Sequence, residues 1–142
     1  MNTKENFKTI AAYGSLRLNE YNYNYLKSIF QDQISYSGCL RTLKGYDLYS
    51  LGSYPAVLEN DSGDASNLVV DIIKCSNDVY HVIKQMEENA GYVEKTFSDP
   101  EYGECIIYVY EDPTISVRNP IIESGDWSLY LREKNERKFI NN

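Results

Sequence analysis

Turn signals divide the chain into short extended runs, and this spacing limits what it can fold into. Runs of apolar or alternating residues are separated by clusters rich in Gly, Pro, Asn and Asp, such as 52–55, 61–64 and 98–103. Helical periodicity appears over about 20–30 and, more clearly, over 77–88. Many short strands with two helices favour an α+β fold around a curled or barrel-like, mostly antiparallel sheet. The predicted strands are 8–13, 34–43, 45–50, 56–58, 68–74, 93–97 and 105–110.

The first predicted strand leads directly into Tyr13-Gly14-Ser15-Leu16-Arg17. A strand followed by a Gly-Ser turn and then a helix places backbone N–H groups at a mouth, where they suit a carboxylate, a phosphate or an oxyanion. A second interpretation is a tight turn in which Gly14 only tolerates a difficult backbone conformation, and this one is favoured for the motif alone. Other segments of the chain are needed to decide between the two.

The second predicted helix separates two neighbouring glutamates by their position around its axis. At about 100° per residue, Glu88 and His81 fall opposite the apolar face and are expected to be exposed. Glu87 lies at the flank, one turn after Ile83, where its carboxylate can reach the edge of the core. Burial beside an apolar pocket raises a carboxyl pKa toward acid–base values, whereas a boundary glutamate extending into solvent is the simpler interpretation. The apolar face consists of Val79, Val82, Ile83, Met86 and Ala90.

Length and charge limit the number of domains and the kinds of partner. At 142 residues the chain suits a single domain over 1–142, in which about 130–142 form a polar C-terminal tail. A net charge of −7 argues against nucleic-acid partners and against docking on an anionic membrane. No stretch approaches a membrane span, and residues 1–6 lack a signal-peptide core. We therefore expect a cytoplasmic protein with no nucleic-acid or membrane partner.

The sequence offers little for metal or histidine chemistry. Cys39, Cys75 and Cys105 are odd in number and show no metal-ligand or redox spacing, so we expect them to be reduced and partly buried. His81 is the single histidine, which leaves zinc sites and Ser-His or Cys-His catalysis without their usual residues. We expect no metal site and no cofactor, and any acid–base work falls to carboxylates or tyrosines.

Three spaced segments resemble the γ-glutamylcyclotransferase-like family, which includes the plant avirulence-induced proteins and small bacterial and phage members. The matches lie in the family's order and spacing and cover about 10–130, with 124–127 similar to the ending of several small members. The first is the most specific, and the combination carries the resemblance. The segments are Tyr13-Gly14-Ser15-Leu16-Arg17 with Asn22 and Leu26; Gly38 with Tyr46-Asp47-Leu48-Tyr49 and Gly52-Ser53-Tyr54-Pro55-Ala56-Val57; and Glu87 with Tyr92 and Tyr108.

This resemblance implies a fold, a reaction and a set of site residues. The implied fold is a small mixed, mostly antiparallel β-barrel with two or more helices and a cavity beside the loop 13–16. In active members the glutamate at the position of Glu87 is the acid–base residue, and the reaction needs no metal or cofactor. The implied reaction releases 5-oxoproline from a small-molecule substrate, a γ-glutamyl amine or short γ-glutamyl peptide. The implied substrate-binding residues are Tyr13, Gly14, Ser15, Leu16, Tyr54 and Tyr108.

The chain departs from the family pattern at several positions. Asn19 stands where the family often has glycine, Lys84 where an aspartate often precedes the glutamate, and Asp71 near the usual strand glycine. These departures separate the chain from the glutathione-handling members. They motivate a second hypothesis, a small-ligand-binding or protein-interaction module without catalysis. A third hypothesis is the transfer of another γ-glutamyl or isopeptide bond to a different acceptor. The sequence shows no apolar surface stripe apart from the core pattern, so it does not indicate an oligomeric state.

Overall fold

The structure is a computed structural model that describes residues 7–64 and 66–140, with the side chains of 138–140 outside the description. The expectation about a signal-peptide core at 1–6 lies outside the described residues. In chain order the elements are β1 (Phe7–Ala12), α1 (Tyr21–Phe30), η2 (Gln31–Gln33), β2 (Ile34–Leu43), β3 (Tyr46–Ser50), β4 (Pro55–Glu59), β5 (Leu68–Ser76), α2 (Asn77–Asn89), β6 (Tyr92–Asp99), β7 (Gly103–Tyr110), α3 (Ile115–Arg118) and α4 (Trp127–Ile140).

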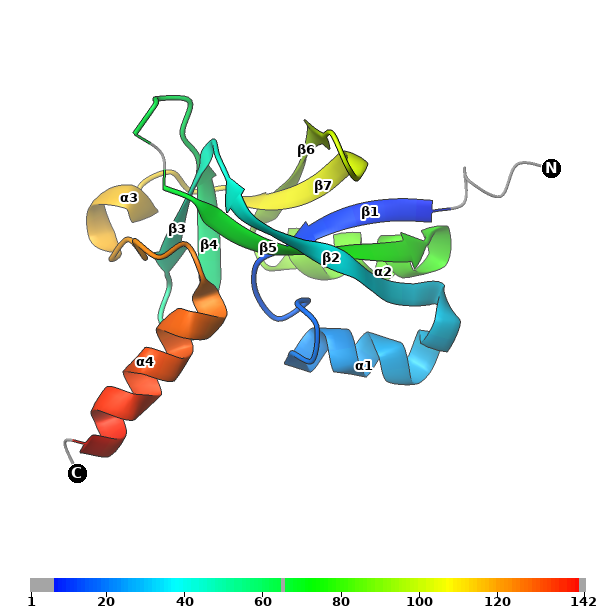
Figure 1. Ribbon diagram of the computed structural model, residues 1–142, viewed down its shortest axis with the longest axis horizontal. Helices are drawn as coiled ribbons and strands as arrows, with labels where there is room; N and C mark the ends of the chain where they lie inside the picture. The colour runs from blue at the N-terminus through cyan, green and yellow to red at the C-terminus, as the bar shows by residue number, and fades with distance from the viewer. Residues whose placement is uncertain (1–6, 65, 141–142) are drawn as a thin grey trace.

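Five strands form one sheet in the order β2-β5-β1-β7-β6, and β3 and β4 form a separate antiparallel pair. Central β1 runs antiparallel to β5 and parallel to β7, with Ile10 opposite Ile73 on one side and Ile106 on the other. The expected α+β class and mostly antiparallel sheet are confirmed. "Barrel" describes the sheet only loosely, because β2 and β6 remain edge strands and do not close on one another. Figure 1 shows the β3–β4 pair standing steeply across one end of the long strands.

Both faces of the sheet are covered, which explains the nearly continuous apolar runs of its central strands. On one face Leu26 of α1 and Ile83 of α2 pack with Ile73 of β5. The other face packs against the β3–β4 pair and the start of α4, through Leu48 and Trp127. The core therefore forms two layers, and α2 is fixed by one of them.

The apolar spacing of α2 predicts which side of this helix is buried. On α2, Val79 and Ile83 are buried, Val82 and Met86 are half-buried, and His81 is exposed, as the spacing predicts. Ala90 is exposed because the helix ends at Asn89. The start of α2 is fixed by Ser76, whose hydroxyl accepts from the backbone N–H of Val79 at 3.3 Å.

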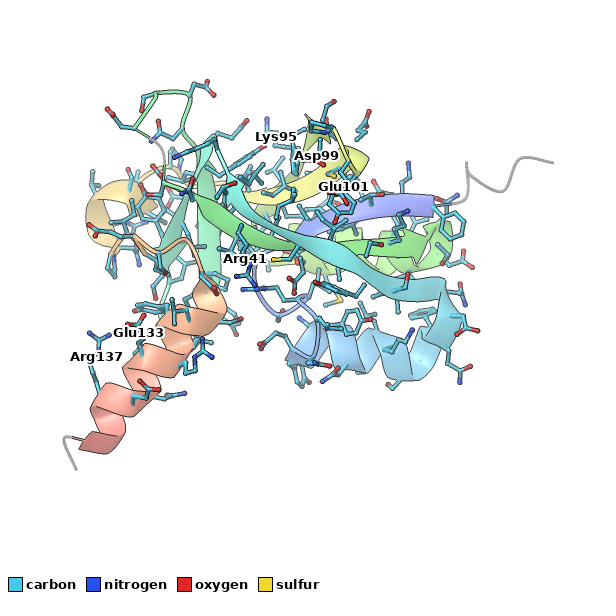
Figure 2. All side chains as sticks on the ribbon, viewed as in Figure 1. Arg41, Lys95, Asp99, Glu101, Glu133 and Arg137 are labelled. Atoms are coloured by element: carbon cyan, nitrogen blue, oxygen red, sulfur yellow. The ribbon has the colours of Figure 1, made fainter. Side chains whose placement is uncertain are left out.

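The expected polar tail is helical through residue 140. Helix α4 begins at buried Trp127, whose ring stacks on Tyr130 at a centroid distance of 5.3 Å. Residues 132–137 are exposed, and Glu133 and Arg137 project from α4 in Figure 2. The sequence of this segment shows no clear apolar period that would have predicted the helix.

Two further expectations concern the described residues 7–64 and 66–140. All three cysteines are free, with Cys75 and Cys105 buried and Cys39 half-buried, as expected. No helix in this part of the chain is long and apolar enough to cross a membrane.

Candidate active site

A cavity of about 390 Å³ opens where several segments meet. Its walls come from the end of β1 with the loop 13–16, the start of α1, the turn 53–54 with the start of β4, the end of α2, and the strands β6 and β7. All seven site residues predicted from the sequence line this one cavity, although they are widely separated along the chain. They are Tyr13, Gly14, Ser15, Leu16, Tyr54, Glu87 and Tyr108. Their proximity does not by itself test their roles.

The loop after β1 presents backbone N–H groups that have no acceptor. The N–H groups of Gly14, Ser15 and Leu16 donate to no atom of the described residues. Their carbonyls, in contrast, are used: the Gly14 oxygen accepts from the N–H of Arg17 at 3.0 Å, and the Ser15 oxygen accepts from Asn22 at 2.9 Å. Because the Ser15 carbonyl takes amides at the start of α1, the free donors are loop amides and not those of the helix. We call 14–16 the amide cradle.

Contacts on both sides hold the amide cradle in place. The side-chain amide of Asn22 donates to Oγ of Ser15 at 2.6 Å. On the other side, a Cβ added at Gly14 would stand 2.8 Å from Cγ of Pro55, closer than real Cβ atoms approach. Gly14 is therefore required by the close approach of the turn 53–55, and its φ is not in the left-handed region.

The loop beyond the cradle explains one departure from the family pattern. Asn19, where the resemblance leads one to expect glycine, has φ of 68°, in the left-handed region that glycine adopts freely. Asparagine is among the side chains that enter this region most readily. Its carbonyl also accepts from the side-chain amide of Asn24 at 3.1 Å. The backbone conformation that favours glycine is thus kept with a different residue.

Glu87 lies in the last turn of α2 and faces the cavity. Burial raises the pKa of its carboxyl from the ordinary 4.5 to about 7. Among the described residues no group hydrogen-bonds to this carboxylate and no cation pairs with it. Glu88, its neighbour, is exposed and lies 3.7 Å from Nζ of Lys84. The two glutamates differ as the helical spacing predicts.

The tyrosines of the inner wall are buried and hydrogen-bonded. The Tyr13 hydroxyl donates to the backbone oxygen of Tyr108, which links the residue before the cradle to β7. The Tyr108 hydroxyl donates to Oε1 of Glu94 at 3.3 Å. Burial raises the pKa of both phenols well above the ordinary 10, so both stay protonated at neutral pH. Tyr54 differs, because 66% of it is exposed at the rim.

Sequence reasoning assigned no role to Tyr92 and Asn22, although both line the cavity. Tyr92 begins β6 directly after α2 ends, and its hydroxyl donates to the Pro55 oxygen at 2.6 Å. It therefore joins the end of α2, where Glu87 lies, to the turn that contacts the cradle. The sequence signal is its position just after Gly91, whose φ of 95° ends the helical segment.

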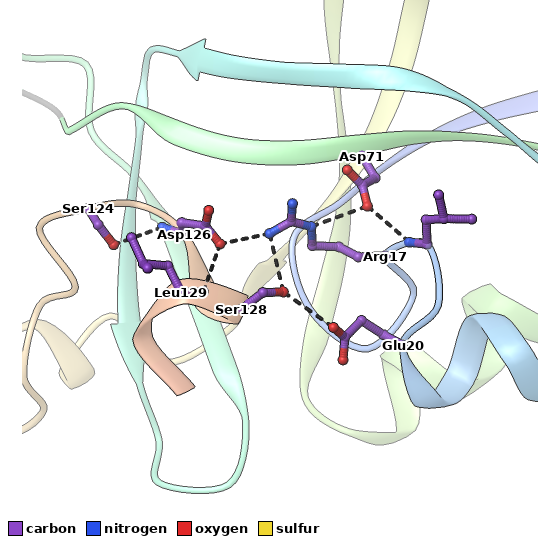
Figure 3. Close-up of polar contacts among 8 residues, drawn as sticks. Arg17, Glu20, Asp71, Ser124, Asp126, Ser128 and Leu129 are labelled. Carbon is purple, nitrogen blue, oxygen red and sulfur yellow. Dashed lines mark hydrogen bonds and ion pairs between the residues drawn. The ribbon is translucent and has the colours of Figure 1, made fainter. Parts of the chain in front are cut away.

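Arg17 anchors the motif to distant parts of the chain (Figure 3). Its Nε lies 3.2 Å from Oδ2 of Asp71 on β5, and its Nη1 lies 2.9 Å from Oδ1 of Asp126 before α4. The same Asp71 oxygen accepts from the backbone N–H of Leu18 at 2.9 Å. Asp71, a departure from the family pattern, thus fixes the loop that follows the cradle.

The arrangement combines a proton-transfer group with unused hydrogen-bond donors. A carboxyl with pKa of about 7 can accept and return a proton near neutral pH. Free amides on the same cavity can stabilise an oxyanion or hold a carboxylate. Over residues 7–64 and 66–140, no three His, Cys, Asp or Glu side chains are grouped to hold a metal ion.

A family model matches most of the chain. Residues 10–129 match the family model described as "Gamma-glutamyl cyclotransferase, AIG2-like". No curated protein sequence matches the chain.

Several solved structures share the fold. An uncharacterized protein of Pyrococcus horikoshii aligns with a TM-score of 0.70 and 21% identity, over 91% of this chain and 97% of that one. The ytfP protein of Escherichia coli aligns with a TM-score of 0.64 and 26% identity, over 84% of this chain and 95% of that one. An AIG2-like protein of Mus musculus aligns with a TM-score of 0.68 and 17% identity, over 85% of this chain and 89% of that one.

Proposed function

Because the chain belongs to the gamma-glutamyl cyclotransferase, AIG2-like family, we propose that it releases 5-oxoproline from a γ-glutamyl amine or short γ-glutamyl peptide. Glu87 is the general base and then the general acid. The observation that carries this proposal is an unpaired carboxyl with pKa of about 7 on the same cavity as the free amides of 14–16.

In the proposed reaction, Glu87 first takes a proton from the α-ammonium group of the γ-glutamyl moiety. The freed amine attacks the γ-carbonyl carbon of the same molecule and closes a five-membered ring. Attack within one molecule already brings the reacting atoms together, so the protein has to fold the substrate and move protons. A carboxyl with pKa of about 7 is suited to this step, because it is largely ionised just above neutral pH yet basic enough to accept a proton.

Ring closure places negative charge on the former carbonyl oxygen. The free N–H groups of Gly14, Ser15 and Leu16 are the donors available to that oxygen or to the α-carboxylate of the substrate. The bond from the ring carbon to the leaving nitrogen then breaks, and the Glu87 carboxylic acid returns its proton to that nitrogen. The ring nitrogen carries two hydrogens after the attack and releases one of them to solvent as the lactam forms. The products are 5-oxoproline and a free amine, and Glu87 is again ionised.

The inner tyrosines support this chemistry as walls. Tyr13 and Tyr108 line the cavity as phenols that stay protonated, so they add no negative charge beside Glu87. Tyr54 contributes the rim. The proposal also keeps the expected cytoplasmic location and, on the net charge of −7, the absence of a nucleic-acid partner.

The test is to incubate the protein with γ-glutamyl amines and γ-glutamyl dipeptides and to follow 5-oxoproline by mass spectrometry. Glu87→Gln is expected to lower the rate by about 10²- to 10⁴-fold. Glu88→Gln, one residue along the same helix and exposed, is the matched control and should keep the wild-type rate. No release from any substrate, or an unchanged rate with Glu87→Gln, contradicts the proposal. A ligand that raises the melting temperature without being converted would support the binding-module hypothesis.

A further inference from the structure

Two tyrosines at the cavity mouth are largely exposed to solvent. Tyr21, the first residue of α1, is 78% exposed, and Tyr54, in the turn before β4, is 66% exposed. Both line the cavity. Within the described residues, neither ring packs on another aromatic ring and neither hydroxyl has a hydrogen-bond partner.

The remaining tyrosines of the cavity have structural partners. The hydroxyls of Tyr13 and Tyr92 each donate to a backbone carbonyl, and the hydroxyl of Tyr108 donates to a carboxylate. All three side chains are buried or half-buried. They form the inner end, near Glu87. In the proposed reaction the γ-glutamyl group reacts beside Glu87, so the substituent on its leaving nitrogen would extend toward the open mouth, where the exposed Tyr21 and Tyr54 lie.

The charge of the cavity restricts what that substituent can be. Of the described residues that line it, only Glu87 has a group that ionises near neutral pH, and none is basic. Arg17, next in the chain to the cradle, already pairs with Asp71 and Asp126. The free amides of 14–16 can serve the α-carboxylate or the oxyanion of the γ-glutamyl moiety. A second carboxylate, on the leaving side, would find no cation there and would meet Glu87 and a protein of net charge −7.

We propose that the leaving group is an arylalkylamine with no charge other than on the nitrogen that it releases, and that its ring binds between Tyr21 and Tyr54. Aromatic side chains favour ring partners in offset or edge-to-face contact, and exposed tyrosines offer such surfaces at little conformational cost. The substrate class is then a γ-glutamyl arylalkylamide and not a γ-glutamyl peptide with a terminal carboxylate. This inference rests on the proposed function.

Three substrates separate the two parts of the inference. γ-Glutamyl-tyramine carries the ring without a carboxylate, γ-glutamyl-tyrosine adds only the carboxylate, and γ-glutamyl-ethylamine lacks the ring. We expect kcat/KM for the tyramine derivative to exceed that for the tyrosine derivative by about tenfold or more. We expect kcat/KM for the tyramine derivative to exceed kcat/KM for the ethylamine derivative by about tenfold, mainly through a lower KM.

Variants at the mouth test which side chains bind the ring. Tyr21→Ala and Tyr54→Ala are each expected to lower kcat/KM for γ-glutamyl-tyramine about threefold to tenfold, and by a larger factor than for γ-glutamyl-ethylamine, which has no ring for them to contact. Tyr25→Ala is the matched control, because Tyr25 lies one turn further along α1, is 53% exposed and does not line the cavity. Tyr25→Ala should leave kcat/KM unchanged for both substrates.

The outcomes separate this inference from the proposed function. Equal kcat/KM for the tyramine and tyrosine derivatives, or for the tyramine and ethylamine derivatives, overturns the inference and leaves the proposed reaction standing. If Tyr21→Ala and Tyr54→Ala lower kcat/KM equally for the tyramine and ethylamine derivatives, the inference is also overturned, because a general structural effect would then explain the loss. Release of 5-oxoproline from none of the three, nor from any γ-glutamyl peptide, contradicts the proposed function itself.

Discussion

Replacing Glu87 with glutamine is expected to stabilise the folded protein above neutral pH and to leave its stability nearly unchanged at pH 4. Burial raises the pKa of Glu87 from the ordinary 4.5 to about 7. Between these values the folded state holds a proton that the unfolded chain has lost, so the free energy of unfolding falls as the pH rises. Above pH 7 the fold bears the whole cost of the buried carboxylate, and glutamine, which stays neutral, removes that cost.

The size of the effect follows from the two pKa values. A difference of one pH unit between the folded and unfolded pKa corresponds to about 1.4 kcal/mol. The interval from 4.5 to about 7 therefore amounts to about 3 kcal/mol at pH 8, or about 2 kcal/mol once water in the open cavity is allowed for. Among the described residues Glu87 has no hydrogen-bond or ion-pair partner to lose, and glutamine has nearly the same shape.

Urea unfolding of the wild type and Glu87→Gln at pH 4, 6 and 8 measures this difference. Glu88→Gln is the control, since the Glu88 side chain is half exposed and its loose pair with Lys84 contributes less than about 0.5 kcal/mol. A stability difference between wild type and Glu87→Gln that is the same at all three pH values would refute burial of the ionised carboxylate as the cause of the raised pKa.

Three further predictions concern the same site. The pH profile of kcat/KM should rise through an inflection near pH 7 as Glu87 loses its proton, and a flat profile between pH 5 and 9 would contradict its role as base. Gly14→Ala should lower the free energy of unfolding by about 1–3 kcal/mol, because the new methyl group meets Pro55; urea unfolding should show partial recovery in the double variant with Pro55→Ala. Arg17→Met should lower the free energy of unfolding by about 3 kcal/mol in the same assay. Asp126→Asn should lower it by less, because Arg17 then keeps Asp71 as a partner. A loss below about 0.5 kcal/mol for Arg17→Met would contradict a stabilising role for the ion pairs.

Local patterns in the sequence predict most elements and one half of the candidate site. The expected strand 34–43 has the same bounds as β2, and the expected helix 77–88 differs from α2 by one residue at its end. The direction of a side chain around a helix follows from its period, so the sequence alone distinguishes Glu87 from Glu88. The family resemblance adds the loop 13–16 as the partner of Glu87, and both line one cavity.

Features that depend on distant partners were not predicted. Openness of the sheet depends on whether β2 and β6 meet, and nothing in either strand specifies this. The partners of Arg17 lie 54 and 109 residues away, and a single sequence carries no signal that joins them. The helical state of 127–140 was missed because its residues show little apolar periodicity.

The ion pair between Arg17 and Asp126 has a consequence for folding during synthesis. Arg17 leaves the ribosome 109 residues before its partner, and β1 before it pairs with β5 and β7, which are made much later. Contacts of such large sequence separation form slowly, because much chain entropy is lost before they are gained. The amide cradle is thus translated before β5 and β7, and it is fixed in place only after both strands have been made. A nascent chain released before Asp126 would have the sequence of the cradle without one of the carboxylates that anchor it.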